Sequence, residues 1–187
     1  EDEATVKTFV EHYKHRLGKV VVIGSTTGFA TIKDHQDVNE STPLLEDMAR
    51  VKGENLIRQI KGVLVYAAGI YGPNRNPVDW VRKGWVAPSP KFLNVIHVKD
   101  LANICYAAML RGQPGAIYIA TDGRPYTWDE LIERWIAQYD ISVSTGAKRS
   151  KRKSKKISAL KTLQELEVHL EYPDIFIGVS ELESPSG

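Results

Sequence analysis

The sequence predicts an open α/β fold, and three observations carry this prediction. Short runs of β-branched and other apolar residues alternate with longer segments in which apolar residues recur at helical spacing. The apolar runs are continuous, which is typical of parallel strands that are buried on both faces. The composition is that of a globular protein, with 42% hydrophobic and 26% charged residues among 187. Together these features predict helices that pack on a parallel sheet.

The first half of the chain predicts two helices and two strands. Apolar residues at helical spacing predict a helix over residues 4–17. The β-branched run at residues 20–23 predicts the first buried strand. A second helix is expected over residues 46–60, and the second buried strand over residues 62–68. This order of helix and strand is the repeat of an α/β sheet.

The second half continues the pattern. Asp100 is expected to cap a helix that ends before Gly112, and residues 116–120 predict the third strand. The run Thr127-Trp128-Asp129-Glu130 has the form of a capping box, which predicts the start of another helix. Ser158 is expected to cap a last short helix.

Charge, cysteine content and hydropathy exclude several classes of protein. The 25 Lys and Arg nearly balance the 23 Asp and Glu, so neither nucleic acid nor an anionic membrane is the expected partner. Cys105 is the only cysteine, which excludes an intramolecular disulfide and favours a reducing compartment. No apolar run approaches the ~20 residues of a membrane helix. The histidines lack the spacing of metal ligands, so no metal site is predicted.

Open α/β sheets bind ligands at the carboxyl ends of their strands, so a phosphate-binding loop is expected there. Neither G-x-G-x-x-G nor G-x-x-x-x-G-K-[ST] occurs in the chain. Gly24 and Gly28 flank the run Ser25-Thr26-Thr27, but their spacing is wrong for a dinucleotide-binding loop. We therefore expect the 187-residue chain to bind NAD(P) weakly or not at all.

Five segments carry a family resemblance. Residues 20–28 are similar to a strand that ends in a Ser-Ser-Thr stretch, residues 40–43 to Glu-x-x-Pro, and residues 68–75 to Gly-Ile-Tyr-Gly-Pro-Gly-Arg. Residues 94–102 are similar to Arg-Ile-His-Val-x-Asp-Leu-Ala, and residues 118–131 to a Tyr-Asn segment that leads into a helix. The chain thereby resembles the extended short-chain dehydrogenase/reductase superfamily, especially atypical NAD-dependent epimerase/dehydratases of the sugar-nucleotide-epimerase-like type.

The resemblance implies the C-terminal part of a Rossmann-like, doubly wound parallel sheet with a small α/β substrate-binding lobe. Residue 1 would fall before the family's fifth strand, so the glycine loop and first four strands lie outside this sequence. We expect residues 1–80 to form a partial NAD(P)-binding domain. Residues 81–187 would supply the remaining strand and the substrate lobe, interleaved with it, and a basic loop at 147–156. The exposed sheet edge would be covered by further residues, a second copy or a different partner chain.

The resemblance also assigns candidate site residues. Thr26 matches the family's catalytic Ser or Thr, and Ser25 lies beside it. The run Tyr71-Gly72-Pro73 matches the loop that lies against the nicotinamide, and Arg75 and Asn94 are the candidate substrate ligands. Each assignment has a structural alternative, because a Thr is common at a strand end and Pro sets the geometry of ordinary turns.

The family's Tyr-x-x-x-Lys pair is the main departure. Aligned on Glu54, the Lys position holds Arg50 and the Tyr position holds Glu46. A shifted register places Lys52 at the Lys position and Met48 at the Tyr position, so neither register supplies a tyrosine. Arginine binds ribose or phosphate but transfers protons poorly, because its pKa exceeds ~12. Glu46 remains as a candidate acid/base, and Arg50 as a candidate cofactor ligand.

Two further features have alternative interpretations. The basic run at residues 148–156 is expected to be a solvated loop rather than a nucleic-acid site, since no aromatic residues are interleaved in it. Trp80 and Trp85 would line a substrate cleft, form a partner surface or pack in a core. His97 and Asp100 are expected to have a structural role, joining a short strand to a helix.

Two functions remain open at this point. The first is an NAD(P)-binding epimerase/dehydratase-like protein, an isomerase, with NAD or NADP as cofactor and a nucleotide-sugar-like small molecule as substrate. The second is a non-catalytic subunit that keeps the fold as a binding or assembly module, because the Tyr-x-x-x-Lys pair is missing. A cytoplasmic location is expected, or an organelle stroma or matrix if a transit peptide precedes residue 1.

Overall fold

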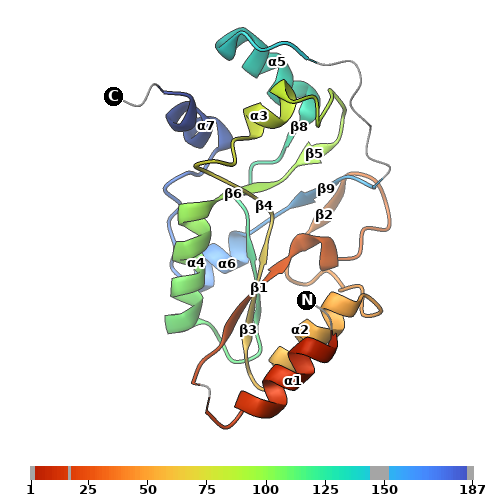
Figure 1. Cartoon of the computed structure of the whole chain (residues 1–187), viewed down its shortest axis with the longest axis vertical. Helices are drawn as coiled ribbons and strands as arrows, with labels where there is room; N and C mark the ends of the chain where they lie inside the picture. The colour runs from red at the N-terminus through yellow and green to blue at the C-terminus, as the bar shows by residue number, and fades with distance from the viewer. Residues whose placement is uncertain (1–2, 17, 144–151, 185–187) are drawn as a thin grey trace.

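The structure is a computed structural model that describes residues 3–16, 18–143 and 152–184. It is elongated, with a parallel sheet in its lower part and a helical lobe above it (Figure 1). The elements in chain order are α1 (Glu3–Tyr13), β1 (Val21–Ser25), the 3-10 turn η1 (Thr26–Gly28), β2 (Gln36–Val38), α2 (Ala49–Gln59), β3 (Val63–Ala67), β4 (Gly69–Tyr71), α3 (Pro77–Arg82), β5 (Phe92–Leu93), β6 (Val95–His97), α4 (Val98–Arg111), β7 (Ile117–Ala120), β8 (Tyr126–Thr127), α5 (Trp128–Tyr139), β9 (Lys155–Ile157), α6 (Leu160–Glu165) and α7 (Ile175–Glu183).

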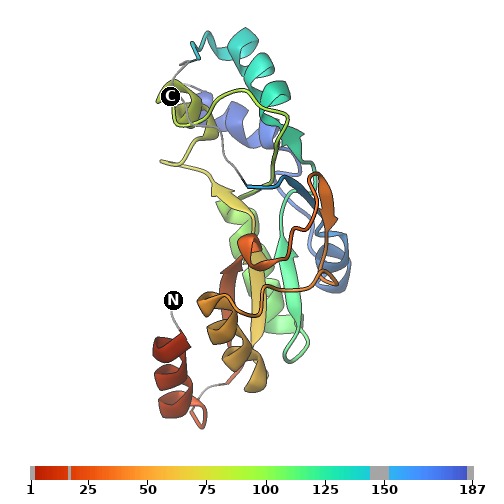
Figure 2. The ribbon, with the colours of Figure 1, turned by 90° about the vertical axis from the view of Figure 1, so that its right-hand side faces the viewer.

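The central sheet has the order β1-β3-β7, and all of its strands are parallel. Every residue of β3 is buried, as its continuous apolar run predicts. Val63 and Val65 belong to the core that includes residues of α4, whereas Leu64 and Tyr66 belong to the core that includes Ile57 of α2. Helices therefore cover both faces of the sheet (Figures 1 and 2), and the predicted α/β class is confirmed.

Strand β1 lies at one edge of this sheet in the part of the chain that the structure describes. Ile23, in the middle of β1, is 52% exposed although it is a large apolar residue. An edge strand with an exposed apolar side chain is a surface on which another strand can pair. The expectation that a partner or further chain covers this edge stays a prediction.

The upper lobe, defined as α3, α5 and α7 with strands β5 and β8, has a core of its own. The residues Val78, Leu131, Trp135 and Val179 pack in it, together with Tyr71 from β4. The short pairs β4–β6 and β5–β8 lead from the central sheet into this lobe. The sequence analysis did not predict helix α7, which completes this core. The proposed domain boundary at residues 80/81 stays a prediction.

Strands β2 and β9 form a second small parallel pair, with Gln36 opposite Lys155 and Val38 opposite Ile157. The end of the basic run is therefore a strand, so the expectation of a loop is wrong for Lys155 and Lys156, although Lys156 is exposed to solvent as expected. Residues 144–151, which include the beginning of the run, lie outside the described residues. Figure 1 shows β9 crossing above the end of β1, so it is placed next to the strand ends where ligands are expected.

Two predicted helix boundaries need correction. The first helix ends at Tyr13 rather than at residue 17. The second begins at Ala49 rather than at residue 46, because Glu46 and Met48 form turns whose backbone N–H groups bond to Leu44 and Leu45. Glu46 therefore precedes the helix on which the family's tyrosine would lie.

The helix caps are partly as predicted. The capping box of Thr127 and Glu130 is confirmed, with both reciprocal hydrogen bonds present. The prediction that Ser158 caps α6 is wrong, because the N-cap is Ala159; Ser158 lies one residue earlier and accepts from the N–H of Leu160. Asp100, however, is not the cap of α4: His97 Nδ1 accepts from the N–H of Lys99 in that role. The carboxylate of Asp100 is engaged by a distant segment instead.

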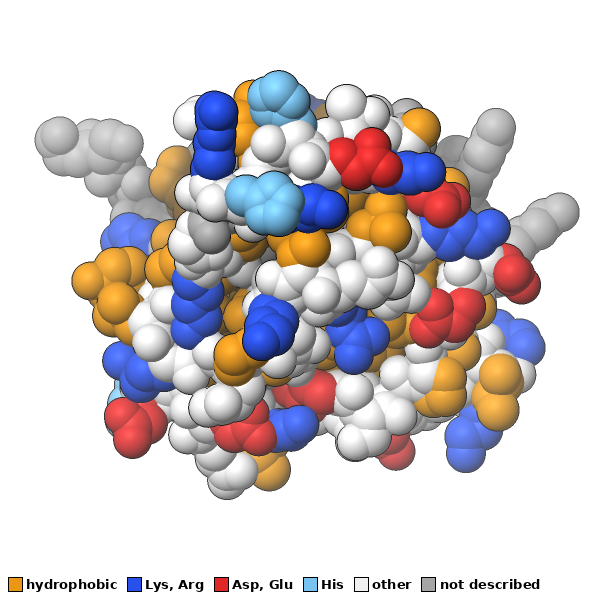
Figure 3. Space-filling view, turned by 90° about the horizontal axis from the view of Figure 1, so that it is seen from below, with side chains coloured by type: hydrophobic (Ala, Val, Ile, Leu, Met, Phe, Trp, Pro, Cys, Tyr) orange, Lys and Arg blue, Asp and Glu red, His pale blue; other side chains and the backbone are white. Residues whose placement is uncertain are grey.

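The surface carries charges of both signs. Figure 3 shows Lys and Arg side chains interspersed with Asp and Glu on the end of the molecule opposite the upper lobe. This mixture matches the formal net charge of +2. Among the described helices, none has both the length and the apolar character needed to cross a membrane.

Candidate functional site

The carboxyl end of β1 leads directly into the turn η1, which holds the predicted catalytic residues. The side chain of Ser25 accepts hydrogen bonds from the N–H and the hydroxyl of Thr27, at 3.3 and 3.0 Å. Thr26 is buried, with 7% of its surface exposed, and its carbonyl accepts a hydrogen bond from Nζ of Lys155. Ser25 and Thr26 thus lie together at the strand end, as the sequence predicts, and a lysine joins them.

A pocket of about 430 Å³ opens beside this turn. We call it the η1 pocket. It lies where an open α/β sheet binds its ligands, at the carboxyl end of β1. Its walls come from η1, from the segment before α2 and from the start of β9. The lining residues are Thr27, Phe29, Thr31, Leu45, Met48, Arg152, Lys153 and Lys155.

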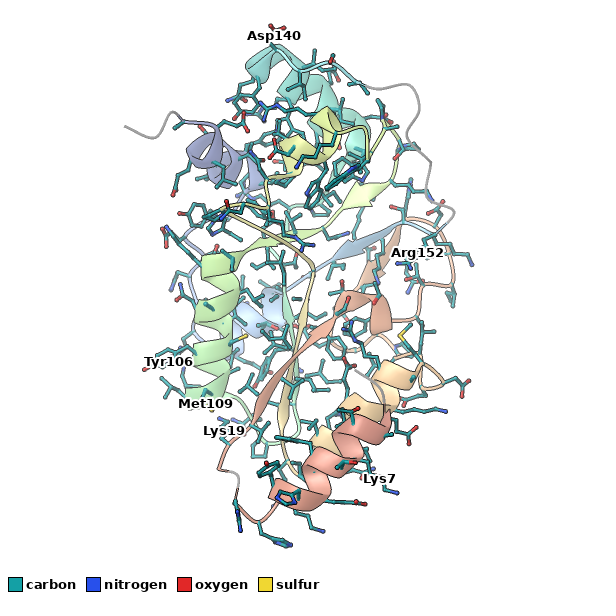
Figure 4. All side chains as sticks on the ribbon, in the orientation of Figure 1. Lys7, Lys19, Tyr106, Met109, Asp140 and Arg152 are labelled. Atoms are coloured by element: carbon teal, nitrogen blue, oxygen red, sulfur yellow. The ribbon has the colours of Figure 1, made fainter. Side chains whose placement is uncertain are left out.

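Three of the lining residues are cations, and the sequence analysis did not assign them to a site. Arg152 is labelled in Figure 4, beside the start of β9. Lys153 donates through Nζ to the carbonyl of Ile32. Burial, followed by repulsion from Arg152, lowers the pKa of Lys155 to about 8. In the sequence, the basic run was the one sign of these cations at the pocket. It has no local pattern that shows which of its lysines points into the pocket.

Arg50 and Glu46 do not line the η1 pocket. Arg50 forms an ion pair with Glu54 at 3.7 Å and lines a separate cavity with Val22 and Ile23 of the edge strand. Glu46 is exposed, and its Oε2 accepts a 2.6 Å hydrogen bond from the side chain of Asn55. The acid/base role of Glu46 and the cofactor role of Arg50 stay predictions.

The Tyr71-Gly72-Pro73 loop is divided between core and surface. Tyr71 is completely buried, and its ring meets His97 edge-on at 5.1 Å between centroids. A Cβ added at Gly178 would lie only 2.3 Å from Tyr71 Oη, so helix α7 covers the hydroxyl closely. Pro73 is exposed. Tyr71 thus belongs to the core of the upper lobe, whereas Thr26 lies under Lys155. Contact of this loop with a cofactor stays a prediction.

Asn94, a predicted substrate ligand, uses its amide within the protein. Its Nδ2 donates to the carbonyl of Lys155 at 2.9 Å, and its Oδ1 accepts from the N–H of Ile157 at 2.8 Å. Both polar atoms therefore hold strand β9 in place. Asn94 acts on the η1 pocket by positioning Lys155, and direct binding of substrate stays a prediction.

Arg75 lies in a second cavity, of about 450 Å³, in the upper part of the molecule. Its guanidinium carbon is 6.0 Å from the ring centroid of Trp80. Trp85 also lines this cavity and is 64% exposed, so it is not a core residue. The two tryptophans therefore form a surface hollow, and Arg75 is separated from the lining of the η1 pocket.

His97 and Cys105 have structural surroundings. His97 is 2% exposed and stacks on Tyr172 with 3.7 Å between ring centroids, and burial lowers its pKa. Cys105 packs against the core under α4, and burial raises the pKa of its thiol. Within the described ranges, no group of three His, Cys, Asp or Glu side chains is arranged to hold a metal ion.

The residues present do not form a cradle for the pyrophosphate of NAD(P). A Cβ at Gly24 would lie 2.9 Å from Glu54 Oε1 and from the ring of Tyr66. A Cβ at Gly28 would lie 3.3 Å from Tyr66 and from Val51. The space beside both glycines is thus filled by the protein's own side chains. In the family of dinucleotide-binding loops, glycines instead let the backbone approach the ligand.

Comparisons with known proteins find similar structures but no matching sequence. No protein-family model matches the chain, and no curated protein sequence matches it. Among solved structures, a conserved protein of unknown function from Silicibacter pomeroyi is 24% identical with a TM-score of 0.80, over 96% of this chain and 71% of its own. The dTDP-glucose 4,6-dehydratase of Bacillus anthracis, in complex with NAD, is 16% identical with a TM-score of 0.73, over 98% and 67%. DesIV, a dTDP-glucose 4,6-dehydratase of Streptomyces venezuelae, is 16% identical with a TM-score of 0.79, over 96% and 63%.

The fold is that of the open α/β class, in which ligands commonly bind at the carboxyl ends of parallel strands. More specifically, the chain has the fold of NAD-dependent epimerase/dehydratases over nearly its whole length. It spans 63% to 71% of the length of the three solved chains described above.

Proposed function

We propose that the chain binds a nucleotide-sugar-like small molecule at the η1 pocket, as part of an NAD(P)-dependent epimerase/dehydratase-like protein. The observation that carries the proposal is the position of Thr26: it directly follows the parallel strand β1, beside a cation-lined pocket, in the fold of dTDP-glucose dehydratases. Cations at such a pocket suit the diphosphate of a nucleotide sugar.

Within the site, the chain's own residues have distinct tasks. The main-chain carbonyl of Thr26 accepts a hydrogen bond from Lys155. Thr26 is buried next to the lining residue Thr27, and its hydroxyl is proposed to hydrogen-bond a hydroxyl of the sugar. Phe29, Leu45 and Met48 give the pocket an apolar wall that suits a sugar or base face. No step is assigned to NAD(P), because the glycines of this chain do not form its cradle. NAD or NADP would be the cofactor of the complete activity.

A second candidate function is a non-catalytic binding module of the same fold. This candidate is favoured by the missing tyrosine: the positions four residues before Arg50 and Lys52 hold Glu46 and Met48. Loss of a general acid/base commonly costs ~10²- to 10⁴-fold in rate. Under this proposal the ligand still binds, but neither epimerisation nor nucleotide reduction follows.

The experiment is calorimetric titration of the 187-residue chain with UDP-glucose and dTDP-glucose. Thr26→Val removes one hydroxyl at nearly constant volume, and we expect it to weaken binding about tenfold, or ~1.4 kcal/mol. Thr8→Val on α1 is the matched control, because the Thr8 hydroxyl donates to the carbonyl of Ala4 within that exposed helix. Equal affinity of both variants and the parent chain would refute the role of Thr26, and the absence of binding to the parent chain would refute the function.

Turnover distinguishes the two candidates. Sugar-nucleotide epimerisation and nucleotide reduction are measured on the parent chain, Thr26→Val and Glu46→Gln with NAD and NADP added. Ligand binding without turnover, in a preparation in which bound NAD or NADP is detected, supports the binding module. Turnover that depends on Thr26 or Glu46 supports the enzyme.

A further inference from the structure

Lys155 is held in place by three separate connections. Strand β9 pairs with β2, so that Lys155 lies opposite Gln36. Asn94 binds the carbonyl of Lys155 and the N–H of Ile157. The Lys155 ammonium itself donates to the carbonyl of Thr26. The side chain is therefore directed into the η1 pocket before any ligand arrives.

Among the described residues, no carboxylate is seen to neutralise the charge of Lys155, which takes part in none of the ion pairs found there. Its neighbours in the pocket include two more cations, Arg152 and Lys153. An ammonium has three N–H donors, and the carbonyl of Thr26 uses one. A half-buried cation without a counter-charge is costly to fold, and an anion in the pocket would offset that cost.

We propose that the η1 pocket binds an oxyanion group of a small-molecule ligand, a phosphate or a carboxylate, with Lys155 as its direct ligand and Arg152 and Lys153 as flanking cations. The inference rests on the proposed function in that both place the ligand at the carboxyl end of β1. It adds that the part of the ligand that contacts Lys155 must carry a negative charge. The pocket volume, about 430 Å³, accommodates a diphosphate or a sugar acid.

The neighbouring residue Lys156 provides a matched control. Successive side chains of a strand point to opposite sides, so Lys156 points away from the pocket that Lys155 lines. Lys156 is exposed, and its Nζ lies 4.9 Å from the ring centroid of Phe92. Lys155→Met and Lys156→Met thus remove the same charge from adjacent positions, and only the first removes it from the pocket.

The test is calorimetric titration with inorganic pyrophosphate, with glucuronate and with UDP-glucose. We expect Lys155→Met to weaken the preferred anion at least tenfold, and Lys156→Met to change its affinity less than twofold. The anion that depends more on Lys155 identifies the group as phosphate or carboxylate. Equal losses in the two variants, or no binding of either simple anion at millimolar concentration, would overturn the inference.

A measurement on the parent chain covers the case in which Lys155→Met does not fold. Pyrophosphate is added to ¹⁵N-labelled protein, and the amide signals of Thr27 and Lys155 are expected to shift together with saturation. Shifts that avoid these two amides would overturn the inference. If Lys155→Met binds UDP-glucose as well as the parent chain does, the inference is wrong and the proposed function is still supported. If anion binding depends on Lys155 but UDP-glucose does not bind, the proposed function is wrong and the inference is still supported.

Discussion

The hydroxyl of Tyr66 donates a 2.7 Å hydrogen bond to Oε2 of Glu54 and thereby joins strand β3 to helix α2. Tyr66 is completely buried and Glu54 is 6% exposed. Burial raises the pKa of Glu54, and the bond from Tyr66 partly opposes this rise. The hydrogen bond therefore holds α2 against the central sheet. The resemblance places the family's Tyr-x-x-x-Lys pair at the start of this helix.

Removal of this bond is expected to destabilise the fold. In Tyr66→Phe the buried carboxylate loses its closest donor, so we expect the free energy of unfolding to fall by ~1–3 kcal/mol. Urea denaturation followed by circular dichroism measures the change. Tyr13→Phe, at a 41% exposed position of α1, is the control and should be nearly neutral. Equal stability of Tyr66→Phe and the parent chain would contradict a structural role for the pair.

Asp122 is expected to make stability fall as pH rises. Burial raises its pKa to about 7 from the ordinary value of 3.8, although the N–H of Arg124 bonds to its Oδ1 at 3.1 Å. Between these two values the folded state keeps a proton that the unfolded state has lost, so stability declines through this window and stays reduced above it. Asp122→Asn keeps the acceptor and removes the ionisation. Urea titrations across the window should show a flatter profile for Asp122→Asn, whereas Asp129→Asn on the exposed surface of α5 should keep the original slope.

Tyr71→Phe is expected to be tolerated or stabilising. Among the described residues, the buried hydroxyl of Tyr71 has no hydrogen-bond partner, and it lies closely against Gly178. Its removal should raise the free energy of unfolding by ~1 kcal/mol. Tyr126→Phe is the matched control with the opposite expected sign, since the Tyr126 hydroxyl donates a 2.9 Å bond to Asp174. A large loss of stability in Tyr71→Phe would show that its hydroxyl has a partner.

Binding of NAD or NADP to the 187-residue chain is expected to be weak or undetectable by calorimetry. The positions beside Gly24 and Gly28 are filled by Glu54, Tyr66 and Val51, so backbone N–H groups there have no room for a pyrophosphate. Inorganic pyrophosphate at the η1 pocket serves as the positive control for anion binding. Tight, stoichiometric NAD(P) binding would reveal a phosphate-binding loop that the sequence motifs do not describe.

The central sheet was predictable because its signal is local. Strands β3 and β7 are continuous apolar runs, as burial on both faces requires, and the apolar run of β1 has the same pattern although Ile23 is exposed at the sheet edge. The capping box at Thr127 is likewise defined by four consecutive residues. Thr26 was placed at a strand end for the same reason. These features depend on neighbours in the sequence, so a single sequence contains them.

The walls of the η1 pocket could not be predicted, because their positions depend on distant partners. Strand β9 has three residues, two of them lysines, and it becomes a strand only beside β2 and the amide of Asn94. Asp100 is a similar case: its carboxylate accepts from the N–H groups of Glu171 and Tyr172, at 2.8 and 2.9 Å, instead of capping α4. The competing cap, His97, is not among the residue types usually preferred there.

The pairing of β2 with β9 joins segments that are far apart in the sequence, with Gln36 opposite Lys155. Closing so long a loop costs more entropy than pairing the central strands, so we expect this short pair to open more readily than the central sheet. Amide hydrogens of Val38 and Ile157 should therefore exchange with solvent faster than those of Val65. A ligand that bridges Thr27 and Lys155 would hold β9 against η1, and its binding would be detected as slower exchange in β9.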